Sequence, residues 1–198
     1  MLWLASTSPR RSALLAAAGF RFERIPPGPE IDGHGAPIDV AGQRAASKAR
    51  GAAPAAPPPR EGAVILGVDT VVDLDGVELG KPTDAAAAER MIVALAGREH
   101  RVHSAVHAIA VDSDGGRREA YGVASATVRF DALDAEQIAS YVAGGSWQGK
   151  AGGYGIQDVA GAFARVVPGT GDVDTVIGLS IASVEALLEA LRPASGGA

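Results

Sequence analysis

The amino-acid sequence predicts an α/β fold built around one mixed β-sheet. Apolar segments of strand length alternate with segments of helical periodicity, which is typical of helices packed on a sheet. Short turns such as Asp75-Gly76 also join strands directly, and hairpins make neighbouring strands antiparallel. The 198 residues suit one compact domain, with two lobes around a shared core. We therefore expect a single domain over residues 1–198 that ends in a frayed tail at 193–198.

The first elements are a strand, a helix and a second strand. Residues 1–5 form an apolar run of strand length. Ser8 and Pro9 suit the N-cap and the first position of a helix, which Gly19 ends. Residues 20–25 are expected to form the second strand.

A loop and a longer helix follow. Residues 26–37 are rich in proline and glycine and predict a loop, and 38–53 predict a helix. The proline-rich segment 52–59 predicts a stiff, exposed connection. Residues 64–74 form a strong strand, and 77–79 return antiparallel to it.

Two further hairpin strands are expected between two helices. Thr83 is expected to cap an alanine-rich helix that Gly97 ends. Residues 102–111 and 122–130 predict strands, joined by a turn at 112–116.

The C-terminal part predicts helices around a loop and a short strand. Asp134 begins a helix with a capping-box pattern and is followed by a glycine-rich loop at 144–155. Residues 163–167 predict a short strand. A last helix is expected from residue 181, because leucines recur there at helical spacing.

Composition and charge exclude several classes of protein. Apolar residues make up 47% and charged residues 21%, which is typical of a globular protein and not of a disordered one. The net charge of -5 disfavours a nucleic-acid-binding role. The chain has no cysteine, so disulfides, thiolate metal sites and thiol catalysis are excluded.

The N-terminal run does not resemble a secretory signal. Basic residues follow the apolar segment 1–5 instead of preceding it. No apolar stretch approaches the roughly 20 residues that span a bilayer. We expect a cytoplasmic protein without a membrane partner.

Common catalytic motifs are missing. The sequence has no GxxxxGK[ST] loop, no GxGxxG after a strand and no GxSxG elbow. The histidines lack zinc-ligand spacing: His103 and His107 fall on one face of a predicted strand, but about 13 Å apart, which is too far for one metal. We expect all four histidines to be structural or on the surface: His34, His100, His103 and His107.

An anion site is one interpretation of the first predicted helix. Arg10 and Arg11 fall in its first turn, where the helix dipole disfavours cations. A bound anion would reverse that penalty, because free N–H groups, guanidinium groups and the hydroxyls of Ser6 and Ser8 would surround it. An exposed helix start with incidental arginines is the equally weighted alternative.

A carboxylate interrupts the strong strand. Asp69 lies among apolar residues, and a buried carboxylate is costly unless it is paired or holds a metal. It is therefore a candidate metal ligand or general base. The alternative is a strand-end aspartate bonded to backbone. The hairpin would place Lys81 near the start of the Asp69 strand or close to Asp69 itself, but taken alone it is an ordinary turn lysine, and Lys48 is equally unremarkable alone.

The glycine-rich segment 149–157 is a candidate ligand loop. Its glycines allow close approach of a ligand to the backbone. The Gln157 amide could bind a base edge, because it offers donors and an acceptor. A flexible loop is the alternative. Trp3 and Trp147 are more readily explained by packing than by stacking on a ligand.

Taken in order, seven segments resemble the Maf family of nucleoside triphosphate pyrophosphatases over nearly the whole chain. Each motif is weak alone, but seven in order are highly specific. The matched segments are L-A-S-x-S-P-R-R at 4–11, K-A at 48–49, D-T-[VI]-V at 69–72, L-G-K-P at 79–82, L-S-G-x-x-H-x-V at 95–102, K-A-G-x-Y-x-I-Q at 150–157 and V-x-G-L-P at 176–180.

The resemblance implies hydrolysis between the α- and β-phosphates with Mg²⁺ or Mn²⁺. Asp69 would hold the metal or activate water, Ser6 would bind a phosphate oxygen, and Glu30 or Asp32 would complete the metal site. Four cations would neutralise the triphosphate: Arg10, Arg11, Lys48 and Lys81.

The K-A-G-x-Y-x-I-Q form resembles the branch that acts on dTTP and UTP, which favours a pyrimidine substrate with Gln157 near the base. The family also implies an elongated α/β domain with a cleft between two lobes, similar to the ITPase fold, and frequent homodimers. The alternatives are pyrophosphatase activity on 7-methyl-GTP or other modified nucleotides, and a nucleotide-binding cell-division regulator with little turnover.

Several positions depart from the family pattern. Ser146 stands where an acidic residue is usual, and Ala126 where the family has threonine. Ser180 replaces a proline, and Gly33 breaks an acidic pair. None of these changes removes an expected phosphate ligand, but they bear on the substrate and the rate.

Overall fold

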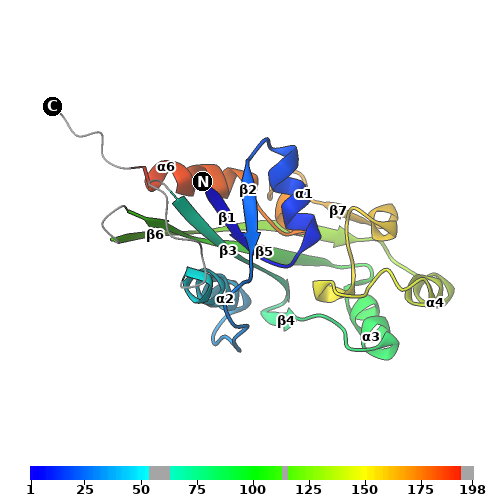
Figure 1. The fold of residues 1–198 in the computed structure, drawn as a ribbon. Helices are drawn as coiled ribbons and strands as arrows, with labels where there is room; N and C mark the ends of the chain where they lie inside the picture. Colours follow the sequence, from blue (N-terminus) through cyan, green and yellow to red (C-terminus); the bar gives the residue numbers. More distant parts are fainter. Residues whose placement is uncertain (54–62, 113–115, 193–198) are drawn as a thin grey trace.

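One mixed sheet runs the length of the molecule (Figure 1). The computed structural model describes residues 1–53, 63–112 and 116–192. The strands lie in the order β2-β1-β3-β5-β6-β7, and β4 pairs with β3. Their bounds are β1 (Leu2–Ala5), β2 (Phe22–Ile25), β3 (Ala63–Leu74), β4 (Val77–Leu79), β5 (Glu99–Val111), β6 (Arg117–Phe130) and β7 (Ala164–Val166).

The sheet changes from parallel to antiparallel at β3. Strand β1 pairs in parallel with both β2 and β3, because a helix follows β1 and another follows β2, and each carries the chain back across the sheet. Strands β3, β5, β6 and β7 then pair antiparallel in series. The prediction of a mixed sheet is confirmed.

Helices cover both faces of the sheet. In Figure 1, α1 and α6 lie on one side of the strands and α2 lies on the other, while α3 and α4 lie together at one end. None of the helices that the structure describes is long and apolar enough to cross a bilayer. Their bounds are α1 (Pro9–Ala17), α2 (Pro37–Ala52), α3 (Ala85–Leu95), α4 (Ala135–Ala143), α5 (Val173–Ile177) and α6 (Ile181–Ala190), with short 3₁₀ turns η2 (Ala151–Gly153) and η3 (Val159–Ala162).

The apolar core is divided between the two ends of the molecule. At one end, α3 and α4 pack on a cluster that includes Val72 and Phe130. At the other end, one cluster lies under α1 and α6 and another lies under α2, with Leu66 and Ile65 on the two faces of β3. The two regions form the two expected lobes, and β3 contributes residues to both.

Gly67 allows α2 to pack very closely on β3. A Cβ atom at this position would lie 2.2 Å from the carbonyl oxygen of Ala45 and 2.4 Å from the backbone nitrogen of Ala49. Only glycine permits such an approach, because both opposing atoms belong to backbone. The inner face of α2, including Lys48, is therefore held directly over the middle of β3.

Several predicted boundaries change. Asp84, and not Thr83, caps α3: its carboxylate accepts a hydrogen bond from the Ala87 amide. Ser8 occupies the N-cap position of α1 without a side-chain capping bond. Strands β5 and β6 begin earlier than predicted because they pair with each other along their full length. The structure also adds α5 and the turns η2 and η3.

Other predictions are confirmed or fall outside the described residues. The Asp134–Gln137 capping box is present. Most of the proline-rich segment 52–59, the central residues of the turn at 112–116 and the tail 193–198 lie outside the described residues.

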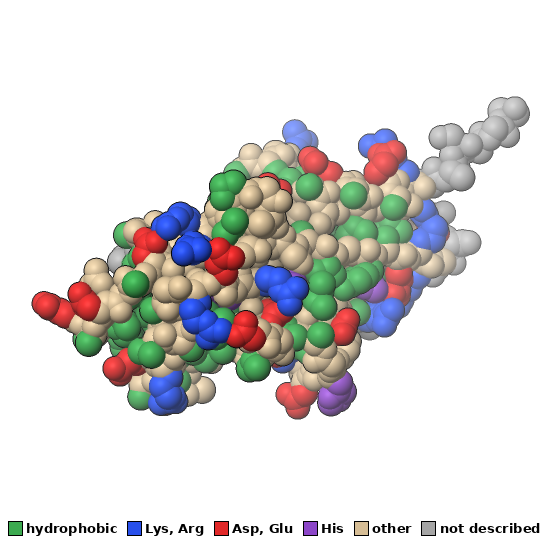
Figure 2. All heavy atoms as spheres, turned by 180° about the vertical axis from the view of Figure 1, so that it is seen from behind, with side chains coloured by type: hydrophobic (Ala, Val, Ile, Leu, Met, Phe, Trp, Pro, Cys, Tyr) green, Lys and Arg blue, Asp and Glu red, His purple; other side chains and the backbone are tan. Residues whose placement is uncertain are grey.

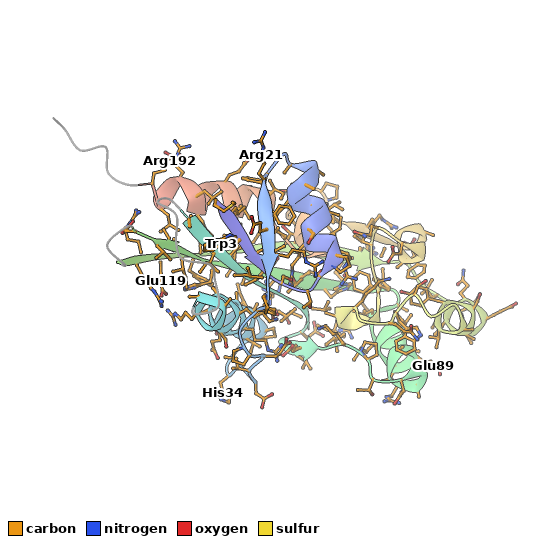
Figure 3. The ribbon with its side chains drawn as sticks, in the orientation of Figure 1. Trp3, Arg21, His34, Glu89, Glu119 and Arg192 are labelled. Carbon is orange, nitrogen blue, oxygen red and sulfur yellow. The ribbon has the colours of Figure 1, made fainter. Side chains whose placement is uncertain are left out.

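The expectation for the histidines and tryptophans holds. His103 and His107 are buried on one face of β5 and bond to Asp73 and Glu119 respectively. His34 lies at the periphery, beyond α2 (Figure 3). The two tryptophans are buried packing residues: Trp3 on β1 belongs to the cluster under α2, and Trp147 lies in the core beside α3 and α4.

His100 gives the fold a testable pH dependence. Its ring is buried, packs edge-on against Phe130 and shares a 2.7 Å hydrogen bond with the Tyr154 hydroxyl. Burial lowers the pKa of His100 from 6.5 to about 4. Because the folded-state pKa is the lower one, the stability contributed by neutral His100 is complete above pH 6.5 and is lost as the pH falls towards 4.

The His100→Gln variant should therefore lose less stability in acid than the wild type. The difference between the two proteins in the free energy of unfolding should change by about 2 kcal/mol between about pH 7.5 and about pH 5. Urea unfolding at both pH values measures it. An equal acid loss in both proteins would show that His100 does not cause the effect.

Candidate functional site

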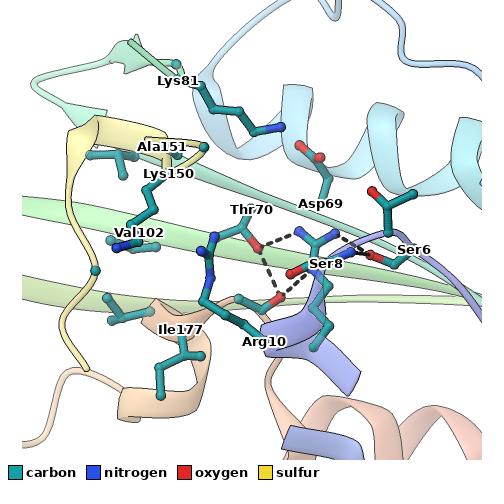
Figure 4. A pocket seen from close by; sticks show the side chains of 18 of the residues that line it. Ser6, Ser8, Arg10, Asp69, Thr70, Lys81, Val102, Lys150, Ala151 and Ile177 are labelled. Atoms are coloured by element: carbon teal, nitrogen blue, oxygen red, sulfur yellow. Dashed lines mark hydrogen bonds between the residues drawn. The ribbon is translucent and has the colours of Figure 1, made fainter. Parts of the chain in front are cut away.

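A cleft of about 560 Å³ opens beside the middle of β3 (Figure 4). It lies where the outer edge of β3 has no strand partner: β1 pairs with β3 only as far as Gly67, and β4 begins to pair at Val72. The open edge lies between the two lobes. Its walls come from the start of α1, the loop before α2, α2 itself, the turn after β4, the loop at 149–157 and the link between α5 and α6.

Asp69 forms the floor of the cleft. The residue is only 5% exposed, and its side chain lies on the same face of β3 as Gly67, the face covered by α2. Lys48 is itself only 7% exposed, and its ammonium lies 2.5 Å from Asp69 Oδ1. The buried carboxylate is therefore paired with a buried lysine, not with backbone at a strand end, and burial of both charges makes the pair costly to break.

Glu30 is the second carboxylate of this group. Its Oε2 lies 3.2 Å from Lys48 Nζ. Partial burial acts to raise the pKa of Glu30, but the positive charges of Lys48, Lys81 and Arg44 outweigh it and hold that pKa below its ordinary value. Asp32 is exposed and lies outside the set of described residues that line the cleft.

The carboxylate pair suits a hard divalent cation. Asp69 and Glu30 converge on one point, the ammonium of Lys48, and offer only oxygen donors. Magnesium is commonly held by one or two carboxylates together with substrate phosphates. Within the described ranges, no group of three or more His, Asp or Glu side chains could hold a metal. The donors therefore fit a cation that is also bound by phosphate, not a closed protein site.

Lys81 and Arg10 bring unpaired positive charge into the cleft. Lys81 comes from the turn after β4, and its side chain points toward Asp69 in Figure 4. Arg10 comes from the first turn of α1. Neither side chain forms a hydrogen bond or ion pair with a residue that the structure describes. Both are available to an anion.

Arg11 is bound to protein instead. Its guanidinium donates to the Gly178 carbonyl at 2.9 Å, the Val68 carbonyl at 2.9 Å, Ser6 Oγ at 3.1 Å and Thr70 Oγ1 at 3.2 Å. Removal of the guanidinium from water lowers the pKa of Arg11, and the nearby Asp69 carboxylate opposes that shift. The two neighbouring arginines therefore differ in role. Arg11 links three segments of the chain by hydrogen bonds, while the Arg10 side chain has no such partner among the described residues.

The loop at 149–157 forms the wall opposite α1 and α2. Tyr154 is buried at its base, where burial raises the pKa of the phenol above its ordinary value. Gln157 is exposed and lines the cleft. Lys150 donates to the Ser146 carbonyl at 2.5 Å and pairs with Asp158.

The cleft contains the site residues expected from the sequence, with Asp32 as the exception. Those that line it are Ser6, Arg10, Arg11, Glu30, Lys48, Asp69, Lys81 and Gln157.

Sequence reasoning missed four contributors to the site. Thr70 and the Gly178 carbonyl hold Arg11, and Thr70 Oγ1 also donates to that carbonyl at 3.1 Å. Arg44 and Glu78 form a 2.5 Å ion pair at the rim. Thr70 and Gly178 lie within matched motifs, so the motifs could have identified them as site residues. Nothing in the sequence marks Arg44 or Glu78 as part of the site.

The chain is similar to known proteins over nearly its whole length. A family model described as "Maf-like protein" matches residues 1–191. A "dTTP/UTP pyrophosphatase" of Shewanella denitrificans is 39% identical, and the alignment covers 96% of each chain. Proteins of the same name from Symbiobacterium thermophilum and Novosphingobium aromaticivorans are 39% and 40% identical, covering 91% and 96% of this chain and 88% and 90% of their own.

Proposed function

The chain belongs to the Maf-like family, and from this we propose that it hydrolyses nucleoside triphosphates, with dTTP and UTP preferred. The bond cut is the anhydride between the α- and β-phosphates, and the products are a nucleoside monophosphate and pyrophosphate. The names of its relatives support this substrate class, since each is called a dTTP/UTP pyrophosphatase.

One observation carries the proposal. A buried strand carboxylate, Asp69, meets cations from separate segments of the chain in one cleft. A triphosphate carries several negative charges, and more develop on the leaving pyrophosphate. Arg10 and Lys81 are free to bind the phosphate oxygens, and Lys48 can turn from the carboxylates toward them. Ser6 and Arg11 shape the wall against which the phosphates lie.

The reaction also requires water to be activated. Asp69 is placed to accept a proton from water or to hold a divalent cation. We propose Mg²⁺ or Mn²⁺, held by Asp69 and Glu30 together with substrate oxygens. When bound, such an ion withdraws charge from the phosphate oxygens. Lys48 then has phosphate in place of its carboxylate partners.

The loop at 149–157 would select the base. Gln157 offers an amide N–H₂ and a carbonyl oxygen, and both can pair with the edge of uracil or thymine. The sugar and base would lie along this wall, across the cleft from α1 and α2. Selectivity and phosphate binding therefore come from different segments.

A panel of nucleotides tests the proposal. The protein is incubated with dTTP, UTP, CTP, ATP or 7-methyl-GTP and Mg²⁺ or Mn²⁺, and released pyrophosphate is measured. We expect UTP and dTTP to give the highest kcat/KM and no turnover after chelation of the metal. Fastest cleavage of 7-methyl-GTP would replace the pyrimidine assignment. Tight nucleotide binding without turnover would favour a regulatory protein.

The surface is consistent with a small-molecule substrate. Figure 2 shows acidic and basic side chains interspersed over the visible face of the described residues, with no continuous basic stripe there. Nucleic-acid binding relies on such a stripe. The cations proposed to bind the phosphates, Arg10, Lys48 and Lys81, instead line the cleft.

A further inference from the structure

We propose that the ion pair between Lys150 and Asp158 sets the orientation of Gln157, which makes Asp158 a positioning residue for base selection. The inference rests on the proposed function and goes beyond it, because Asp158 is absent from the cleft lining. Asp158 acts through its neighbour and does not touch the nucleotide.

The first half of the ligand loop is fixed by the core. The Gly152 amide donates to the Gly80 carbonyl at 2.9 Å, and the Tyr141 hydroxyl donates to the Gly153 carbonyl at 3.0 Å. The buried Tyr154 hydroxyl shares a hydrogen bond with His100. The backbone is therefore held as far as Tyr154, and these bonds do not reach Gln157.

The second half is held by a turn that ends at Asp158. The Asp158 amide donates to the Gly155 carbonyl at 2.9 Å, and the Gly161 amide donates to the Asp158 carbonyl at 2.9 Å. Gln157 lies inside this turn, and its side chain has no hydrogen bond to a residue that the structure describes. Its direction into the cleft therefore depends on the turn.

The ion pair lies directly against that turn. A Cβ atom at Gly155 would be 2.6 Å from Asp158 Oδ2 and 3.1 Å from Lys150 Cδ. The salt bridge therefore passes over the backbone of Gly155 and links the turn to the fixed part of the loop. Glycine at this position leaves room for the pair as it stands, since a Cβ atom would require the Asp158 carboxylate to shift.

Asp158 is the one charged partner of Lys150 among the described residues. Within the described ranges, the ammonium group otherwise donates only to the Ser146 carbonyl at 2.5 Å. The Lys150 side chain is 13% exposed and the Asp158 side chain 34% exposed, so water screens the lysine end of the pair less than the aspartate end. Removal of the Asp158 carboxylate would free both the turn and the ammonium, and Gln157 would lose its defined orientation.

The test compares Asp158→Ala and Asp158→Asn with wild type on UTP and CTP. These nucleotides differ at the base edge that an amide contacts, where UTP has a carbonyl oxygen and CTP an amino group. We expect the ratio of kcat/KM for UTP to that for CTP to fall about tenfold in Asp158→Ala. The change should lie mainly in KM, with kcat for UTP within about threefold of wild type. Asp158→Asn should lie between the two proteins.

A double variant separates positioning from general damage. If Asp158 acts through Gln157, adding Asp158→Ala to Gln157→Ala should leave the UTP-to-CTP ratio where Gln157→Ala alone puts it. Asp131→Ala is the matched control, because Asp131 forms a 2.7 Å surface ion pair with Arg165 away from the cleft. It should keep the wild-type ratio.

Three outcomes decide the matter. An unchanged ratio in Asp158→Ala overturns the inference and leaves the proposed function intact. A UTP-to-CTP ratio of kcat/KM that is lower in the double variant than in Gln157→Ala also overturns the inference, because Asp158 would then act on base selection without Gln157. If wild type neither cleaves nor binds UTP, with binding measured by calorimetry on a non-hydrolysable analogue, the proposed function fails and this inference fails with it.

Discussion

Replacement of Asp69 by Asn is expected to lower kcat for UTP by about 10²–10⁴-fold without unfolding the protein. The amide has nearly the same shape but cannot accept a proton or hold a cation as a carboxylate does. It also leaves the Lys48 ammonium with Glu30 alone as a charged partner. Pyrophosphate release under saturating UTP measures the loss, and circular dichroism checks the fold.

Asp73→Asn is the matched control. Asp73 lies on the same face of the same strand and is buried, but it pairs with His103 and Arg101 and does not line the cleft. This variant should have a lower free energy of unfolding than the wild type. Its kcat for UTP, calculated per mole of folded protein, should stay at the wild-type value. Near wild-type turnover by Asp69→Asn would remove Asp69 from the mechanism.

The largest stability effect is expected at Arg11. Replacement by Ala leaves the Val68 and Gly178 carbonyls and two hydroxyls without their donor. Buried acceptors that lose a charged donor cost about 1–3 kcal/mol each before relaxation, so the free energy of unfolding should fall by about 2–4 kcal/mol. Thermal or urea unfolding measures this loss.

The neighbouring arginine provides the comparison. Arg10→Ala should unfold at the wild-type Tm, because its side chain has no hydrogen-bond or ion-pair partner in the described structure. Its KM for UTP should rise instead, since a phosphate contact is lost. Equal stability losses in both variants would contradict the division of roles between the two arginines.

Local patterns were sufficient to predict most of the fold. Alternation and apolar runs predicted the strands around Asp69, and capping chemistry predicted the helix at Asp134. The errors lie at boundaries that depend on partners. Strand β6 extends back to Arg117 because β5 pairs with it there. A polar segment becomes strand when a neighbour supplies its hydrogen bonds.

The sequence predicted which residues line the cleft but not which of them contact one another. Motif order identified Asp69, Lys48 and Arg11 as cleft residues. The sequence could not show that Lys48 pairs with Asp69, because that contact needs the close approach of α2 at Gly67. The sequence also could not show that the Arg11 guanidinium donates its hydrogen bonds to protein acceptors, since one of them, Gly178, lies far along the chain.

The shared role of β3 has a consequence for cooperativity. Leu66, in the first half of β3, packs into the core of one lobe, and Val72, in the second half, packs into the core of the other. The cleft lies between them. Neither lobe can lose its order without releasing the strand that carries Asp69. A nucleotide that bridges the gap in the edge of β3 would bind only the fully folded chain, and by mass action it would stabilise both lobes together. Ligand affinity and global unfolding are thus linked through a single strand.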